Sequence, residues 1–215
     1  MENNLKENLY KEVDIRKNKI IELKNSGINP YAAKFDETHS IMQARELSEG
    51  TVVSVAGRMV SRRAFGKFMF TQISDIYAKI QVSLSVNEIE LEKYKWFKDY
   101  VDIGDFVGFT GELYRTQTGE LTIKATEFKL LSKAMLPLPE KFHGLTDIEA
   151  RYRQRYLDLV SNETSRKVFL ARSKCESIIR RHLEDLGFIE IETPVLQTAV
   201  SGASARPFFT HHNAL

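Results

Sequence analysis

Three short stretches of this 215-residue sequence concentrate arginine and lysine, the side chains that bind phosphate groups. Such clusters are able to hold a nucleic acid by its backbone, although a run of charges is more often a solvated protein face. The formal net charge is only +2, so any nucleic-acid partner must be held locally rather than by a globally basic coat. The clusters are Arg58, Arg62, Arg63 and Lys67; Arg151, Arg153 and Arg155; and Arg180 and Arg181.

Metal and disulfide chemistry find little support in the sequence. His211 and His212 are adjacent, and neighbouring side chains of a strand point apart, so we expect no metal site there. Cys175 is the single cysteine, which excludes an internal disulfide and is typical of a reducing compartment. No apolar run approaches the roughly 20 residues of a membrane span, and the first residues do not resemble a signal peptide. These features predict a soluble, cytoplasmic protein.

The middle of the chain, residues 50–132, must form strands, because apolar and polar residues alternate there. The alternation is clearest around Ile80, Val82 and Leu84, and further strands are expected near residues 53–56, 68–73, 106–114 and 121–131. Thr118-Gly119 predicts a turn between the last two strands. Residues 87–100 predict a helix capped by Asn87. Three strands, a helix and two strands are the order of a five-stranded OB-fold barrel, with a generic small barrel as the alternative.

Helices are expected on both sides of the barrel. Before it, Leu5, Leu9 and Val13 recur every four residues, and Gly27 should end this helix. After it, Leu136-Pro137-Leu138-Pro139 breaks regular structure and predicts a domain junction.

A long amphipathic helix follows in the last part of the chain. Asn162 or Thr164 should cap it, and Gly187 should end it. Phe188 to Ile191 then alternate with glutamates, which predicts a short strand ended by Pro194. The apolar stripe of the helix comprises Val168, Ala171, Cys175, Ile178, Ile179, Leu183 and Leu186.

The segment from Gly187 to Pro194 resembles motif 1 of the class II aminoacyl-tRNA synthetases, in which a long helix and a strand form the dimer interface. Residues 141–159 and 205–215 look like the sequences that flank motif 1 in lysyl-tRNA synthetases. The resemblance implies an α+β, mainly β protein with a helix and linker at 1–49, an anticodon-binding OB-fold at 50–132, a linker at 133–160 and the start of the catalytic domain at 161–215. It also places Gly187, Phe188 and Pro194 in a homodimer interface.

For the barrel, the resemblance implies binding of the anticodon loop of tRNA(Lys). Phe70 matches the ring on which the central uridine stacks, and Gln81 and Arg63 match positions that contact the base or the backbone. Arg62 and Glu120 are added as further anticodon contacts. Apart from the resemblance, Gln81 lies between Ile80 and Val82 and must point away from their core face. The alternatives are that Phe70 is a core residue and Gln81 an ordinary solvent-facing one.

The full enzymes of this family use ATP and Mg²⁺ to activate lysine, and then transfer it to tRNA(Lys). The 215 residues contain neither the Phe-Arg-x-Glu of motif 2 nor the Gly-x-Arg of motif 3, so we expect no catalytic residue and no activity from this chain alone. Gly202 and Ala203 match a loop near the bound amino acid, although Val200-Ser201 replaces the family's Pro-Gly and Gly202 is equally explained as a turn glycine. Two alternatives remain: an inert tRNA-binding module and a general single-strand-binding barrel.

Overall fold

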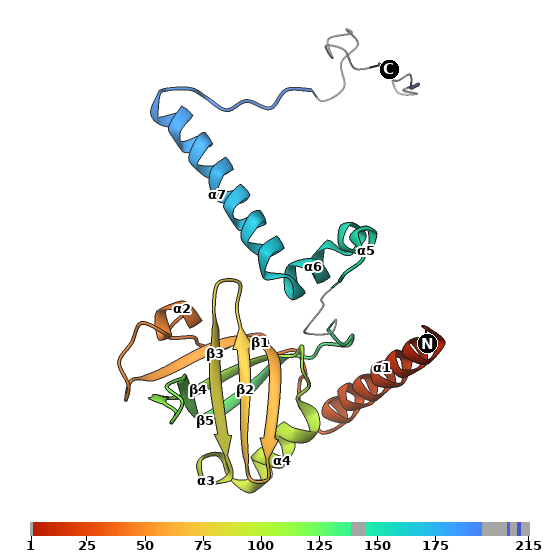
Figure 1. Cartoon of the computed structure of the whole chain (residues 1–215), viewed down its shortest axis with the longest axis vertical. Coiled ribbons are helices and arrows are strands. Elements are labelled where there is room, and N and C mark those ends of the chain that lie inside the picture. The colour runs from red at the N-terminus through yellow and green to blue at the C-terminus, as the bar shows by residue number, and fades with distance from the viewer. Residues whose placement is uncertain (1, 139–144, 195–205, 207–209, 212–215) are drawn as a thin grey trace. The chain divides into compact units, whose positions relative to one another are not determined.

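The computed structural model describes residues 2–138, 145–194, 206 and 210–211 (Figure 1). The chain forms two compact units, Met1–Gly144 and Leu145–Leu215. In the described parts of both units, no helix combines the length and the apolar character that a membrane crossing requires.

The first unit begins with helix α1, Glu2–Asn25, which ends before Gly27 as predicted. Gly27 has a φ of 75°, a backbone conformation that favours glycine at a helix end. Leu23 of α1 is buried in the same apolar cluster as the barrel core. The short helix α2, Ile41–Ala44, follows with a capping box between Ser40 and Gln43.

Five strands form a closed barrel in the order β1-β2-β3-β5-β4, which confirms the predicted OB-fold. Neighbouring strands are antiparallel except for β3 and β5, which pair in parallel and close the barrel. The strands are β1 (Val52–Phe65), β2 (Phe68–Ser74), β3 (Lys79–Ser85), β4 (Phe106–Arg115) and β5 (Leu121–Ser132).

The barrel interior is filled by the apolar residues of the alternating pattern. Val53, Ile80 and Val82 are fully buried, while Gln81 between the last two is only half-buried. Gly111 permits β4 and β5 to approach closely, because a Cβ at this position would lie 2.1 Å from the carbonyl oxygen of Lys124. The turn predicted at Thr118-Gly119 is present, with Gly119 at a φ of 83°.

Two helices rather than one connect β3 to β4, so the prediction of a single helix over 87–100 was wrong. They are α3, Val86–Ile89, and α4, Leu91–Tyr100. Glu90 separates them with a φ of 67°, which no helix accommodates. The expected cap, Asn87, lies inside α3, and Ser85 caps the helix by accepting a hydrogen bond from the Asn87 backbone. Phe97 of α4 is fully buried against the barrel core, with its ring 5.8 Å from that of Phe109.

The second unit contains three helices in its described part: α5 (Ile148–Arg153), α6 (Arg155–Ser161) and α7 (Glu163–Asp185). Two of them lie in the segment that the sequence suggested was a linker. Asn162 caps α7 by accepting a hydrogen bond from Ser165, which decides between the two expected caps. Gly187 follows α7 with a φ of 86°. Residues 188–191 form no strand in the described structure, so that prediction was wrong, because a strand requires a hydrogen-bonded neighbour.

A buried carboxylate joins these helices. Asp158 is fully buried and receives hydrogen bonds from Arg151 at 2.9 Å and from Arg155. Burial raises the pKa of Asp158, but the hydrogen bonds from these arginines and Ser165 outweigh it, so its pKa is lower than usual. Two of the three arginines in this basic cluster therefore hold the fold together.

Candidate nucleic-acid interface

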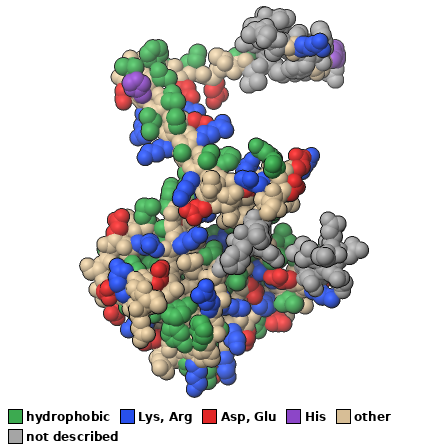
Figure 2. All heavy atoms as spheres, viewed as in Figure 1, with side chains coloured by type: hydrophobic (Ala, Val, Ile, Leu, Met, Phe, Trp, Pro, Cys, Tyr) green, Lys and Arg blue, Asp and Glu red, His purple; other side chains and the backbone are tan. Residues whose placement is uncertain are grey.

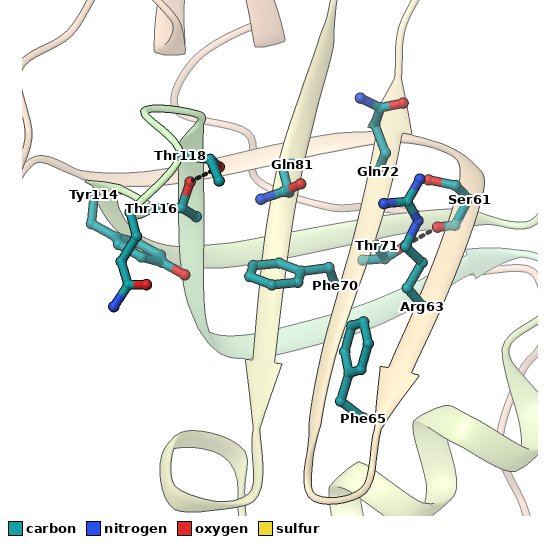
Figure 3. Close-up of a pocket in the computed structure, with 11 residues that line it drawn as sticks. Ser61, Arg63, Phe65, Phe70, Thr71, Gln72, Gln81, Tyr114, Thr116 and Thr118 are labelled. Atoms are coloured by element: carbon teal, nitrogen blue, oxygen red, sulfur yellow. Dashed lines mark hydrogen bonds between the residues drawn. The ribbon is translucent and has the colours of Figure 1, made fainter.

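A groove with a volume of ≈ 620 Å³ lies on the outer face of the barrel (Figure 3). Side chains from four strands and from the β4–β5 turn line it, so residues far apart in the sequence meet there. The lining residues are Ser61, Arg63, Phe65, Phe70, Thr71, Gln72, Gln81, Tyr114, Thr116, Gln117 and Thr118.

A β-bulge in β1 aims Arg63 into this groove. Val53, Val55 and Met59 are odd-numbered and face the core. The pairing of β1 with β2 then shifts between Met59 and Ser61, which inserts one extra residue. Because side chains alternate along a strand, the bulge moves the odd-numbered residues to the outer face, where Ser61 and Arg63 line the groove.

The same bulge turns Arg62 away from the groove. Its guanidinium donates hydrogen bonds to the carbonyl oxygens of Lys98 and Val101, at 3.1 and 2.7 Å, and so satisfies the C-terminal end of α4. Arg62 was predicted to contact the anticodon, but the structure does not bring it together with the other predicted residues. Its position supports a structural role instead.

Phe70 occupies the centre of the groove, with core positions of β2 on either side of it. Met69 and Thr71 are buried, whereas Phe70 is half-buried and lines the groove. Its partner across the ladder on β3 is the small residue Ser83, which leaves room for the ring over that strand (Figure 3). Phe68 meets the Phe70 ring edge-on, with the centroids 4.8 Å apart, and restricts its orientation.

Gln81 lies beside this ring, and a hydrogen bond to the neighbouring strand β5 orients its amide. Its Nε2 donates a 3.0 Å hydrogen bond to Oγ1 of Thr122, and the Thr122 hydroxyl donates in turn to the carbonyl oxygen of Glu120 at 3.1 Å. Thr122 is fully buried, so this short chain is shielded from water. The remaining N–H and the carbonyl oxygen of Gln81 are left for a ligand.

Several groove residues were not anticipated from the sequence. Tyr114 of β4 donates a 3.0 Å hydrogen bond from its hydroxyl to Ser83 and forms one wall. Thr116 and Thr118 hydrogen-bond to each other at 3.0 Å in the β4–β5 turn. The alternation of side chains along β4 places Tyr114 on the same outer face as Glu112, so its position could have been predicted. No sequence pattern indicates that the β4–β5 turn lies near β3.

The other predicted site residues lie elsewhere. Glu120 is exposed in the β4–β5 turn and does not line the groove with its side chain. Gly187, Phe188 and Pro194 follow α7 and are exposed. Gly202 and Ala203 lie outside the described residues. In the described part of the chain, no group of three or more His, Cys, Asp or Glu side chains is arranged to hold a metal ion.

Charge around the barrel is mixed rather than uniformly basic. Basic and acidic side chains alternate over the face visible in Figure 2. Within the groove, Arg63 is the only charged residue among those that line it. Arg58, from the same basic cluster, donates to the carbonyl oxygen of Gly104 and lies 4.3 Å from the Phe106 ring. A groove with one cation, an exposed ring and amide groups suits a single-stranded base better than a bare phosphate.

Comparisons with known proteins agree with the barrel fold. Residues 53–131 match the family described as OB-fold nucleic acid binding domain, and residues 147–215 match tRNA synthetases class II (D, K and N). The chain is similar to proteins named Lysine--tRNA ligase from Bacillus subtilis (43% identical over 97% of this chain and 44% of that protein) and Enterococcus faecalis (46%, over 97% and 44%). It is 54% identical to the Lysine--tRNA ligase of Aquifex aeolicus over 76% of this chain and 27% of that protein.

The chain thus spans a little under half of the length of the first two relatives. The two family matches follow each other along the chain in the order of its two compact units. These matches agree with relatives that align along nearly all of its residues, so lysine–tRNA ligases are homologues of this chain, and its two parts match an OB-fold nucleic-acid-binding domain and a class II tRNA synthetase domain.

Proposed function

We propose that the barrel binds the anticodon loop of tRNA(Lys), with the central uridine stacked on Phe70. The observation that carries this proposal is the outward-facing ring of Phe70 beside the oriented amide of Gln81 in one groove. Stacking on an aromatic ring supplies affinity for any base, about 1–3 kcal/mol per base. The Gln81 amide supplies selectivity, because a base with the wrong edge leaves polar groups unpaired.

Arg63 acts on the phosphate backbone at the edge of the groove. Its side chain is exposed, as a group that meets phosphate from solvent should be. Glu120, exposed in the β4–β5 turn next to the groove residue Thr118, is in reach of a base that flanks the central one. We assign Arg62 no contact with RNA.

In the longer protein of this family, we propose the reaction named for its relatives, the ligation of lysine to tRNA. ATP and Mg²⁺ would supply the activation of lysine there. This chain's own residues are assigned binding and not chemistry, because its 215 residues contain neither motif 2 nor motif 3. Gly202 and Ala203 remain proposed as contacts of the amino acid, and the cytoplasm as the compartment.

We also propose that α7 forms a homodimer interface together with Gly187, Phe188 and Pro194. The apolar stripe of α7 is exposed in this structure, with Val168 and Ile179 at 61% and 54% exposure (Figure 2). A face of this kind on a soluble helix is typical of a subunit contact.

The test of anticodon binding uses the 215-residue chain and fluorescently labelled anticodon stem-loops. We expect the loop with a central uridine to bind more tightly than loops with cytidine or with an abasic site at that position. Equal affinity for all three loops and for an unstructured DNA strand would instead indicate a general single-strand-binding barrel. A second assay separates an inert module from part of an enzyme. The chain is joined to the remaining part of a related lysine–tRNA ligase, and the fusion should ligate lysine to tRNA only if the chain is part of an enzyme.

A further inference from the structure

Gln72 is a second amide in the wall of the groove, and the proposed function assigns it no role. It lies on β2 two residues after Phe70, so both side chains leave the same face of the strand. Across the ladders its partners are Ser61 on β1 and Gln81 on β3. The three residues form one polar row beside the row that contains Phe70 (Figure 3).

The two amides of this row differ in how they are engaged. Gln81 donates one N–H to Thr122 at 3.0 Å. The side chain of Gln72 is half-buried and has no hydrogen-bond partner within the described parts of the chain. A half-buried amide without a protein partner, in the wall of a ligand groove, is available to a ligand.

The edge of uracil has more hydrogen-bonding groups than the Gln81 amide alone is able to pair with. That edge presents two carbonyl oxygens on either side of one N–H. With one N–H bound to Thr122, Gln81 retains one donor and one acceptor, which pair with the uracil N–H and with one carbonyl. The second carbonyl then needs a separate donor beside Gln81.

We infer that Gln72 supplies this donor and is a second specificity-determining residue of the groove. Cross-strand partners in a sheet have their Cβ atoms about 4.5–5.5 Å apart, so two long amide side chains on neighbouring strands are able to reach the same base edge. A base stacked on Phe70 is thus read by two neighbouring amides, one fixed by Thr122 and one free to adjust. The inference rests on the proposed stacking of a uridine on Phe70.

The test compares wild type, Gln72→Met, Phe70→Ala and Thr126→Val in the 215-residue chain. Methionine keeps the length of glutamine but cannot donate a hydrogen bond. Thr126 is exposed on β5 outside the groove, so Thr126→Val serves as the control for loss of a surface polar group. Each protein is titrated with stem-loops carrying a central uridine or an abasic site, and its thermal unfolding is recorded to show that it is folded.

We expect Gln72→Met to bind the uridine loop about fivefold to tenfold more weakly, the usual effect of one lost hydrogen bond. Its affinity for the abasic loop should equal that of wild type, because the proposed partner is the base. Unchanged affinity for uridine, or equal losses on both loops, would overturn the inference while Phe70→Ala still weakens uridine binding. If wild type itself does not prefer uridine to the abasic loop, the proposed function and this inference both fail.

Discussion

Gln81 and Thr122 are joined by a 3.0 Å hydrogen bond across the parallel pairing of β3 and β5. The bond leaves the Gln81 amide one orientation, with its second N–H and its carbonyl oxygen turned to the groove. A base-reading amide held in this way cannot rotate to suit cytosine, whose edge has a donor where uracil has an acceptor.

Thr122→Val should therefore reduce selectivity more than affinity. Valine fills the space of threonine but cannot accept from Gln81, so the amide is free to turn. We expect the ratio of affinities for uridine and cytidine loops to fall about twofold to tenfold, in line with one net hydrogen bond. Titration of both loops measures this ratio, and a ratio equal to that of wild type would show that Thr122 does not orient Gln81.

Phe70→Ala should weaken every loop that carries a central base. The loss of one stacking platform costs about 1–3 kcal/mol in binding free energy, with little change in the preference among bases. Tyr77→Ala is the matched control, because Tyr77 is an exposed aromatic residue outside the groove. Isothermal titration calorimetry with the uridine loop measures these affinities. If Phe70→Ala and Tyr77→Ala both bind the loop as tightly as wild type, the base does not stack on Phe70.

Arg63 and Arg62 are adjacent in sequence but should respond oppositely to substitution. Arg63→Ala should weaken all sequences alike and reduce the slope of log affinity against log salt concentration by about one. Arg62→Ala should leave the affinity nearly unchanged but lower the free energy of unfolding by about 1–3 kcal/mol, because two carbonyl oxygens at the end of α4 lose their donor. Binding isotherms at several salt concentrations and urea denaturation test the pair. If Arg62→Ala is fully folded but binds the loop more weakly than wild type, Arg62 contacts the RNA after all.

Acidification should loosen the attachment of α1 to the barrel. Asp102 binds Lys19 and Lys133, each at 2.7 Å, and Lys133 also binds the fully buried Asp105 at 2.6 Å. Burial raises the pKa of Asp102, but the hydrogen bonds from Lys133 and Lys19 outweigh burial and lower it below the ordinary 3.8. A carboxyl with a lowered pKa in the folded state stabilises the fold above that ordinary value and ceases to do so as the pH falls through its folded pKa.

Asp102→Asn should consequently be less stable than wild type at neutral pH by about 1–3 kcal/mol. This difference should shrink as the pH falls from 3.8 toward the lowered pKa of folded Asp102, because the unfolded carboxyl is protonated first and the folded one loses its charge at the lower pH. Urea denaturation along a pH series gives both curves. A constant difference down to the lowest pH at which the protein folds would contradict the role of this carboxylate.

The apolar stripe of α7 should make the chain self-associate. Leu183→Arg places a charge in the stripe and should shift the protein toward the monomer. Ser177→Arg adds the same charge on the opposite face of the helix and should not. Light scattering at several micromolar concentrations measures the mass. A wild-type chain that stays monomeric throughout would count against the interface.

The positions of the strands could be predicted from the sequence, because Ile80, Val82 and Leu84 lie on one face of an extended chain and only one register buries them. Gly187 likewise predicted the end of α7, and its start was predicted to within two residues, with Asn162 and Thr164 as the possible caps. The break at Glu90 could not be predicted, since a glutamate carries no preference for a positive φ.

The binding groove was less accessible to prediction than the barrel. Period-two alternation puts Arg62 and Arg63 on opposite faces, but the bulge between Met59 and Ser61 decides which one faces the groove. No residue type there signals a bulge. The resemblance to a known family, and not the local pattern, therefore predicts Phe70 and Gln81. Gln72 is placed in the groove by its cross-strand pairing with Gln81, which the sequence alone does not reveal.

The parallel pairing of β3 and β5 has a consequence for folding during synthesis on the ribosome. Gln81 and Thr122 are 41 positions apart, and α3, α4 and β4 must be made before the two strands are able to meet. Closing so long a loop carries an entropy cost and tends to slow folding. The groove takes part of its lining from β3 and part from the β4–β5 turn, so the proposed RNA-binding surface of a nascent chain is incomplete until the barrel has closed. If the proposed function holds, synthesis itself would delay the first encounter with tRNA until then.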